Sequence, residues 1–366
     1  MERVGRFTYL LGEAYALGQK QGAELSHIPE IERILFNESG LTNQRTMIAI
    51  GQLEMYYPSL LEELKGVADY FNRDIREHTF LDTAYLVAGG CSLGVLSSQN
   101  SQDDNPYVIR MYDLGAEISD FRMCSTNKSK AYKHSGFSVM FFGRSEGINE
   151  HGLCVTFAAC GLPVGNAPGM IQPKINGLNF MVIVRLLLET CQRTEEAVEM
   201  IKKLPIASNM NLLITDALED TVVVETMNGD IYVKESTESY TIATNHALVD
   251  EVKTVQKEYL VQSEKRYHLM ESTMGQNEKI SKDDLFELMA TPYPKGLAMH
   301  NYQEFFGTVY TALFDISQRS IYFSFGSPAF NSVHELKVGE DFSQKFFELN
   351  LPNESYGPTF WERRKY

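Results

Sequence analysis

The spacing of hydrophobic residues changes from helical intervals to short strand-like segments near residue 87. Before that point, apolar residues recur at helical intervals, as in residues 60–67 (LLEELKGV), whose apolar members would share one helix face. Ser59 and Glu62 have the spacing of a capping box at the start of this helix. The first ninety residues are therefore predicted to be mostly helical.

After residue 87 the chain consists of short segments rich in β-branched and aromatic residues, separated by residues that favour turns. Predicted strands cover residues 90–100, 105–113, 137–143, 153–161, 210–217, 221–228, 230–236, 240–248, 307–315 and 320–328. Predicted helices cover residues 177–192, 194–205, 250–272 and 281–291, and Ser281 and Asp284 have the spacing of a capping box at the start of the last of them. Residues 147–153 (GINEHGL) are predicted to form a tight hairpin. Strands in two blocks, with helices before, between and after them, indicate one α+β domain over residues 1–366.

The composition narrows the classes of function. A formal net charge of −15 over 366 residues repels phosphate backbones, so nucleic acid is not expected as a partner. No run approaches 18 consecutive apolar residues, and we expect no membrane span. The apolar start of the chain is interrupted by Gly12 and Glu13, unlike a signal peptide, which predicts a cytoplasmic protein. The five cysteines include no C-x-x-C pair, so we expect reduced thiols and neither disulfides nor a zinc site.

Cys91 follows two glycines at the start of a predicted strand, in GGCSLG (89–94). A buried thiol, a nucleophile activated by one of the eight histidines and an N-terminal nucleophile all fit this position. None of the histidines lies in a known motif of a cysteine protease. In the third case the chain is cut between Gly90 and Cys91, and the new α-amine, with an ordinary pKa of about 7.7–8.0, is the base. Glycine leaves its carbonyl open to attack by the thiol in an N-to-S acyl shift.

Seven segments, in a characteristic order, resemble those of a known family. They are ELKGVAD (63–69), GGCSLG (89–94), RMYD (110–113), EGINEHGLCV (146–155), ATNHAL (243–248), SEKRY (263–267), and GTVYTALFD (307–315) followed by FGSP (325–328). The sequence resembles the acyl-coenzyme A:6-aminopenicillanic acid acyltransferase-like family of N-terminal-nucleophile hydrolases, which is related to penicillin V acylases and bile salt hydrolases. The resemblance extends over nearly the whole chain. It implies a four-layer αββα sandwich of two antiparallel sheets, with the nucleophile at the start of a central strand.

The resemblance also implies roles for individual residues. Cys91 would be the nucleophile, exposed as an N-terminus by cleavage after Gly90, and Ser92 keeps a hydroxyl where threonine is frequent in the family. Asp113 would accept a hydrogen bond from the α-amine of Cys91 and hold it in place. Asn245 would donate its side-chain amide to the oxyanion of the tetrahedral intermediate.

Two arginines and a threonine complete the implied site. Arg110 would contact the substrate or pair with an acid, Arg266 would be a second arginine near the site, and Thr308 would assist processing with its hydroxyl. Arg110 precedes Asp113 by three positions, so on an ideal strand the two would face opposite sides, and a bend or bulge between them is expected. His246 is predicted to have a structural role, because its side chain should point away from that of its neighbour.

The favoured function is hydrolysis of a linear amide through an acyl-thioester on Cys91. The alternative within the family is an acyltransferase that moves an acyl group from acyl-coenzyme A or an amide to an amine through the same thioester. Residues 1–90 would become a small chain and residues 91–366 a large chain, and the two would stay associated. The substrate would be a small N-acyl amide or acyl thioester, no cofactor or metal is expected, and a homo-oligomer is compatible with the sequence. A non-enzymatic ligand-binding sandwich and a classical cysteine protease are the alternatives from other classes.

Overall fold

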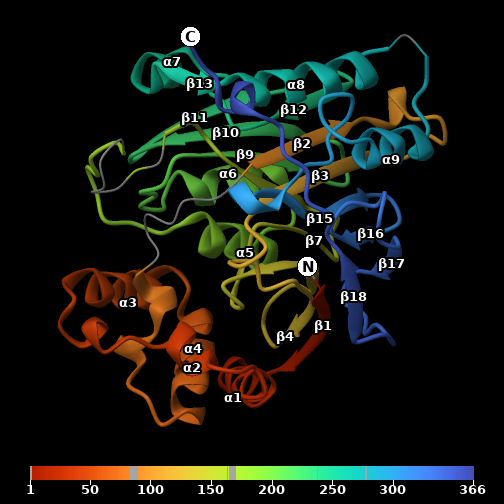
Figure 1. Ribbon diagram of the computed structural model, residues 1–366. Coiled ribbons are helices and arrows are strands. Elements are labelled where there is room, and N and C mark those ends of the chain that lie inside the picture. The colour runs from red at the N-terminus through yellow and green to blue at the C-terminus, as the bar shows by residue number, and fades with distance from the viewer. Residues whose placement is uncertain (1, 83–89, 163, 165–169, 237, 277) are drawn as a thin grey trace.

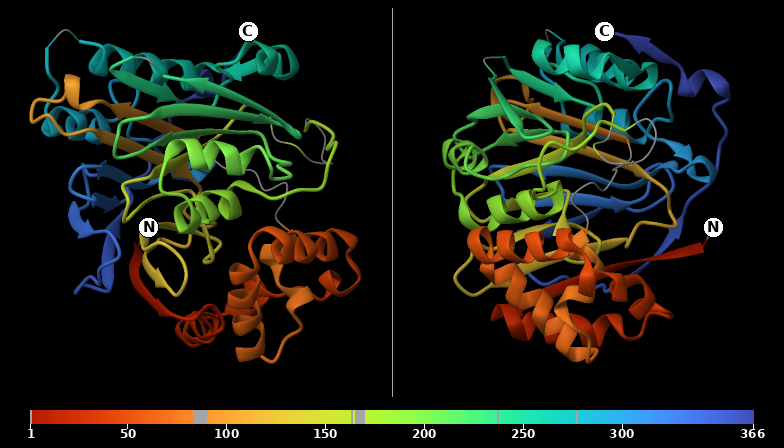
Figure 2. Two further views of the ribbon diagram at one scale, coloured as in Figure 1. Left: turned by 180° about the vertical axis from the view of Figure 1, so that it is seen from behind. Right: turned by 90° about the vertical axis from the view of Figure 1, so that its left-hand side faces the viewer.

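The computed structural model describes residues 2–82, 90–162, 164, 170–236, 238–276 and 278–366. Two large β-sheets face each other, and helices cover the outer face of each sheet (Figure 1). The predicted αββα sandwich is therefore confirmed. The two further views in Figure 2 show the N-terminal helices gathered at one end of this sandwich.

The first sheet contains strands from both ends of the chain. Its strands run in the order β11 (Asp230–Glu235), β10 (Thr221–Met227), β9 (Met210–Thr215), β8 (Cys154–Ala159), β7 (Glu146–Asn149), β5 (His134–Val139), β4 (Arg122–Lys128), β1 (Glu2–Gly12) and β18 (Phe346–Asn350), with β6 (Gly143–Arg144) paired to β5. The pairs are antiparallel except for β1 and β4, which are parallel, so the expectation of a purely antiparallel sheet is wrong for this pair. The predicted hairpin at GINEHGL is confirmed, because it joins β7 to β8.

The second sheet contains Cys91. Its strands run in the order β12 (Tyr240–Ala243), β2 (Gly90–Leu96), β3 (Tyr107–Leu114), β15 (Phe306–Asp315), β16 (Ser320–Phe325) and β17 (His334–Lys337), with β14 (His300–Asn301) paired to β15. All of these pairs are antiparallel. Because β2 has a neighbour on each side, Cys91 lies at the start of an inner strand. A separate small sheet pairs β13 (Glu258–Leu260) with β19 (Arg363–Lys365).

Helices bury the outer faces of the sheets. They are α5 (Phe180–Thr190) and α6 (Thr194–Ile201) on the first sheet, and α8 (Val261–Met274) and α9 (Lys282–Ala290) on the second, with α7 (Asp250–Gln256) preceding β13. The predicted capping box at α9 is confirmed, because Ser281 Oγ accepts from the Asp284 amide at 3.1 Å and Asp284 accepts from the Ser281 amide at 2.8 Å. None of the helices described by the structure is long and apolar enough to span a membrane.

The N-terminal region differs from the prediction in two respects. Helices do fill most of it, namely α1 (Ala14–Leu25), α2 (Ile31–Leu35), α3 (Gln44–Tyr56) and α4 (Pro58–Tyr70). The chain begins, however, with β1, a strand inside the first sheet. The capping box predicted at Ser59 is also wrong, because α4 already starts at Pro58 and Ser59 Oγ accepts a hydrogen bond from Lys128 at 3.0 Å. Helices α1 and α4 cross closely, since a Cβ on Gly18 would lie 2.0 Å from the Glu63 carbonyl oxygen.

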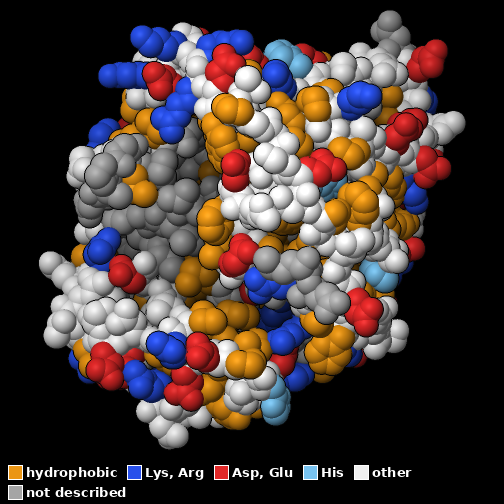
Figure 3. Space-filling model, viewed as in Figure 1, with side chains coloured by type: hydrophobic (Ala, Val, Ile, Leu, Met, Phe, Trp, Pro, Cys, Tyr) orange, Lys and Arg blue, Asp and Glu red, His pale blue; other side chains and the backbone are white. Residues whose placement is uncertain are grey.

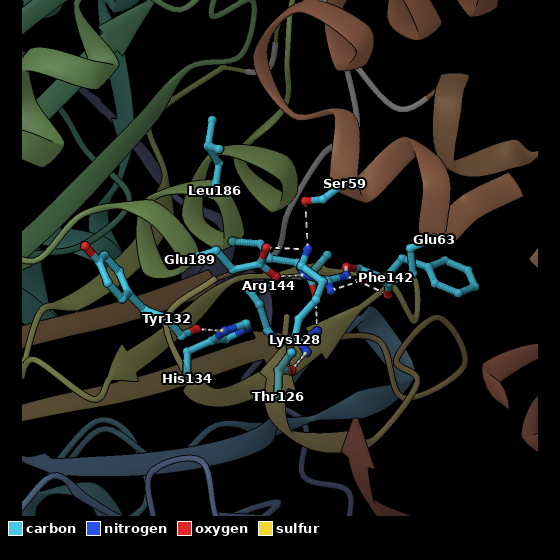
Figure 4. A network of polar contacts seen from close by, with 12 residues as sticks. Ser59, Glu63, Thr126, Lys128, Tyr132, His134, Phe142, Arg144, Leu186 and Glu189 are labelled. Carbon is cyan, nitrogen blue, oxygen red and sulfur yellow. Dashed lines mark hydrogen bonds and ion pairs between the residues drawn. The ribbon is translucent and has the colours of Figure 1, made fainter. Parts of the chain in front are cut away.

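A network of buried charges joins α4 to the sandwich (Figure 4). Glu63 of α4 accepts hydrogen bonds from Arg185 of α5 at 3.0 and 2.6 Å, and Arg185 also donates to Glu189 at 3.0 Å. Lys128 of β4 pairs with Glu189 and donates to Ser59 of α4. The four charged side chains are almost completely buried, so each depends on its partner for solvation. The outer surface is different: in Figure 3 acidic and basic side chains are interspersed across the visible face.

Candidate active site

Cys91 is completely buried at the start of β2, where it pairs with Tyr112 of β3. Its backbone N–H donates to Asn245 Oδ1 at 2.7 Å. Burial raises the pKa of the Cys91 thiol, while the nearby Arg110 guanidinium opposes that rise by charge and by a hydrogen bond. The sulfur is therefore a neutral thiol at pH 7, with a cation beside it that would stabilise a thiolate.

Arg266 holds the other end of the Cys91 residue. It lies on α8, is fully buried, and donates through Nη1 to the Cys91 carbonyl oxygen and to Ser92 Oγ, the latter at 3.0 Å. Its Nη2 donates to Asn245 Oδ1 at 2.9 Å. One guanidinium thus joins β2 to the asparagine after β12, and the planar fork of arginine is suited to such a contact.

Asp113 lies across the ladder from Gly90, next to the predicted cleavage point. Thr308 of β15 donates to Asp113 Oδ1 at 2.7 Å and accepts from the Met299 amide at 2.9 Å. The second carboxylate oxygen of Asp113 is buried and has no partner among the residues that the structure describes. Burial raises the pKa of this carboxyl, and Arg266 opposes the rise. This second oxygen of Asp113 is thus an available hydrogen-bond acceptor beside the N-terminal end of β2.

Arg110 and Asp113 face opposite sides of the sheet, as their spacing requires. Arg110 points between the two sheets, where its Nε donates to Glu146 at 3.2 Å and its guanidinium lies over the Tyr112 ring at 4.7 Å. The expected bend between them is absent from the β2–β3 register, which runs without a shift from Gly90 to Leu96. The irregularity lies in the partner strand β15, between Thr308 and Tyr310. The two residues therefore approach Cys91 from its two faces.

Gly90 is enclosed by an aromatic ring. A Cβ placed on it would lie 2.2 Å from the Cζ atom of Phe306, a distance that real Cβ atoms do not reach. The first residue before Cys91 must therefore be glycine unless Phe306 moves. The other glycine of the motif, Gly89, lies outside the described residues.

The family model for acyl-coenzyme A:6-aminopenicillanic acid acyl-transferase matches residues 100–329. The chain belongs to this family. The match contains Arg110, Asp113, Asn245, Arg266 and Thr308, and it begins after Cys91. No curated protein sequence matches the chain.

Three solved structures are similar to this member of the acyl-transferase family at low identity. A mutant conjugated bile acid hydrolase from Clostridium perfringens has 12% identity and a TM-score of 0.47, covering 73% of this chain and 98% of its own. Penicillin V acylase from Agrobacterium tumefaciens has 16% identity and a TM-score of 0.48, covering 68% and 86%. The Caenorhabditis elegans ortholog of N-acylethanolamine-hydrolyzing acid amidase has 12% identity and a TM-score of 0.43, covering 62% and 93%. These similarities are too distant to assign a substrate.

Asn245 presents an unexpected atom to Cys91. The prediction made its amide nitrogen a donor to the oxyanion, but here Nδ2 donates to the Ala159 carbonyl at 2.9 Å and Oδ1 faces Cys91. The neighbouring His246 contacts Thr244 Oγ1 and Ser263 Oγ, both at 2.9 Å. Burial lowers the pKa of His246 to about 4, so its ring is neutral at pH 7.

Sequence reasoning missed two polar residues of the site. Asn211 of β9 donates to the carbonyls of Thr244 and His246, both at 3.0 Å, and so fixes the backbone on each side of Asn245. Glu146 of β7 accepts hydrogen bonds from Arg110 and from the Tyr310 hydroxyl, the latter at 3.0 Å. Asn211 was visible as a single polar residue within an apolar strand segment, a pattern that requires buried hydrogen-bond partners, whereas Glu146 follows Arg144 and Ser145 and gave no such signal. No group of three or more metal-binding side chains occurs in the described ranges.

Proposed function

We propose that this member of the acyl-transferase family is an N-terminal-nucleophile amidohydrolase that cleaves itself between Gly90 and Cys91. The observation that carries the proposal is that distant side chains bind both backbone groups of Cys91, its N–H and its carbonyl oxygen. Asn245 accepts from its nitrogen and Arg266 donates to its carbonyl oxygen, although both come from more than 150 positions further along the chain. Side chains, and not the backbone of the neighbouring strand β12, satisfy both backbone groups of Cys91, because β12 pairs with β2 only from Leu93 onward.

Self-cleavage would take two balanced steps. The Cys91 sulfur attacks the Gly90 carbonyl carbon, the carbon–nitrogen bond breaks, and the thiol proton moves to the departing nitrogen. Water then hydrolyses the Gly90 thioester, which leaves a carboxylate on Gly90 and a free thiol and amine on Cys91. Thr308 and Asp113 lie beside this bond, and the Asp113 oxygen without a partner would accept from the new ammonium group.

The free α-amine then becomes the general base for substrate. It takes the Cys91 thiol proton as sulfur attacks the acyl carbon of an N-acyl amide, and it returns the proton to the amine that leaves. Water resolves the acyl-thioester and restores the enzyme. Arg110 stabilises the thiolate, and Asn245 keeps the α-amine oriented through the Oδ1 contact it already makes. The role of Asn245 as an oxyanion donor stays a prediction, because it requires the amide to turn.

An acyltransferase is the second candidate, because the name of the family records that activity. It shares every step up to the acyl-thioester and differs only in the acceptor, which would be an amine in place of water. Residues 1–90 and 91–366 would remain together in either case, since β1 is an inner strand of the first sheet and Glu63 pairs with Arg185.

The denatured mass of the purified protein tests this proposal. Wild type is expected as two fragments that meet at Gly90 and Cys91, and Cys91→Ala as one intact chain. Cys154→Ala is the matched control, because Cys154 is also a buried free thiol on a strand, and it should be cut normally. An intact wild-type chain, or a cut Cys91→Ala chain, would contradict self-cleavage. Release of amine from N-acyl amides, with and without added acceptor amines, then separates hydrolase from transferase.

A further inference from the structure

The segment that carries Asn245 has no regular secondary structure. It consists of residues 244–249 (TNHALV), which connect β12 to α7. The backbone N–H and C=O groups of such a segment cannot bond within a ladder or a helix, so other groups must satisfy those that are buried. The side chains that do so determine where Asn245 lies relative to Cys91.

Two neighbouring side chains of the first sheet bind this segment. Asn211 of β9 lies directly opposite Glu225 of β10, so the two side chains share one face of the sheet, and both are completely buried. Asn211 donates through Nδ2 to the carbonyl oxygens of Thr244 and His246, both at 3.0 Å. A single amide group thus holds the first half of the segment.

Glu225 holds the second half. Its two carboxylate oxygens accept from the backbone amides of Leu248 and Val249, at 2.5 and 2.9 Å. Burial raises the pKa of Glu225 to about 7, and the two amides oppose that rise. Titratable groups from the surrounding elements also lie close to it, namely Tyr232 and Lys234 of β11, Lys253 of α7, Cys160 after β8 and Tyr366 after β19.

Asn245 lies between these two points of attachment. Its own N–H donates to Ser263 Oγ at 2.8 Å, and its carbonyl oxygen accepts from the Gly161 amide at 2.9 Å. With the backbone held in this way, Oδ1 accepts from the Cys91 N–H at 2.7 Å. Loss of the Asn211 amide would leave two buried carbonyls without a partner, and the segment would have to shift to satisfy them.

We propose that Asn211 and Glu225 are positioning residues for the chemistry at Cys91, because they hold residues 244–249 so that Asn245 Oδ1 stays at the Cys91 nitrogen. Both act through Asn245. The proposal rests on the proposed function, which makes this nitrogen first the leaving group of self-cleavage and then the general base. A misplacement of about 1 Å can cost about 100-fold in rate. We expect self-cleavage to slow by at least about tenfold when either residue is replaced.

The experiment follows fragment formation by mass spectrometry after cell-free synthesis, in Asn211→Leu and in Glu225→Gln. Thr226→Val is the matched control, because Thr226 is completely buried on β10 and its Oγ1 donates to the Ser208 carbonyl oxygen at 2.7 Å, outside the segment. All three variants lose buried hydrogen bonds, and urea unfolding measures what each loses in stability.

Only the first two variants should be cut at least about tenfold more slowly than wild type. Glu225→Gln keeps the size of the side chain and one acceptor, so it decides the outcome if Asn211→Leu does not fold. Cleavage of both variants within about threefold of the wild-type rate, or equal slowing in Thr226→Val, would overturn the proposal.

The pH profile separates positioning from a purely structural role. A protonated Glu225 has lost one of its two acceptor oxygens, and Glu225→Gln has lost one at every pH. The ratio of the wild-type cleavage rate to that of Glu225→Gln should therefore rise as Glu225 ionises around pH 7. The pH dependence of the Cys91 thiol is common to both proteins and cancels in the ratio. A ratio that stays constant across this range would overturn the role of Glu225.

Hydrogen exchange in an uncut chain distinguishes failure of this proposal from failure of self-cleavage. In Cys91→Ala the amide of residue 91 still faces Asn245 Oδ1, so its exchange rate reports the position of Asn245. Adding Asn211→Leu should speed this exchange by at least about tenfold, and adding Thr226→Val should not. If wild type stays intact but the exchange responds, self-cleavage fails and the positioning role stands. If wild type is cut and neither cleavage nor exchange responds to Asn211→Leu, the positioning role fails.

Discussion

Replacing Glu63 by glutamine should cost several times more stability than replacing its exposed neighbour Glu62. The carboxylate is fully buried and accepts from both terminal nitrogens of Arg185 and from Gln21 Nε2 at 2.7 Å. Glutamine keeps one acceptor but removes the charge, which leaves Arg185 and Lys128 to share Glu189 as their only carboxylate in this network. Breaking a buried pair from one side typically costs about 3–5 kcal/mol. We expect about 3 kcal/mol for Glu63→Gln.

Urea unfolding at pH 7 measures this loss, and Glu62→Gln is the matched control. Glu62 is the preceding residue of the same helix, its side chain is half exposed, and it pairs with Lys65 at 2.9 Å. An exposed pair of this kind contributes at most about 0.5 kcal/mol. If Glu63→Gln costs less than about 1 kcal/mol, the network does not stabilise the fold as argued.

The same pair of variants gives a pH dependence. Burial would raise the pKa of Glu63, but Arg185 and Lys128 outweigh it and hold the pKa below its ordinary value of 4.5. The stabilisation is therefore fully present above pH 4.5 and is lost as pH falls through the lower pKa of the folded state. The difference between wild type and Glu63→Gln should shrink in acid. A difference that grows below pH 4.5 would contradict this sign.

Three other changes test separate parts of the structure. Gly90→Ala should slow or abolish cleavage, because its Cβ would meet the Phe306 ring at 2.2 Å, and adding Phe306→Leu should restore part of the rate of fragment formation by mass spectrometry. Arg266→Lys keeps the charge but loses the planar fork that reaches both Cys91 and Asn245. The rate of self-cleavage, followed over a time course, should therefore fall by at least about tenfold. An unchanged rate would show that Arg266 takes no part in cleavage. Ser281→Ala removes the cap of α9 and should cost about 1 kcal/mol in thermal unfolding.

Local signals were enough for elements that form from neighbouring residues alone. The capping box at Ser281 needs only residues within one turn, and the GINEHGL hairpin needs only its own turn residues, so both could be predicted. Ser59 shows the limit of such a pattern. Its spacing to Glu62 is that of a capping box, but Pro58 already fits the first helical position, and Lys128 from a distant strand takes the hydroxyl.

The parts that could not be predicted depend on distant partners. Strand β1 pairs with β4 and β18, which lie more than a hundred residues away, and its own residues show no strict alternation. The family resemblance named Arg266 and Asn245, but it did not reveal which atoms meet. Oδ1 of Asn245 faces Cys91 because Nδ2 donates to the Ala159 carbonyl oxygen, and Ala159 belongs to the other sheet.

The long sequence separation of the groups around Cys91 also bears on how the protein is made. Cys91 is synthesised well before Asn245, Arg266 and Thr308, and these supply the contacts at its nitrogen, at its carbonyl oxygen and at Asp113. The nascent chain therefore carries the scissile bond through most of its synthesis without the groups that would act on it. Long-range contacts of this kind form late in folding. On the proposed mechanism, the cut is delayed until the ribosome has delivered β15, so both fragments are already folded together when the chain is severed.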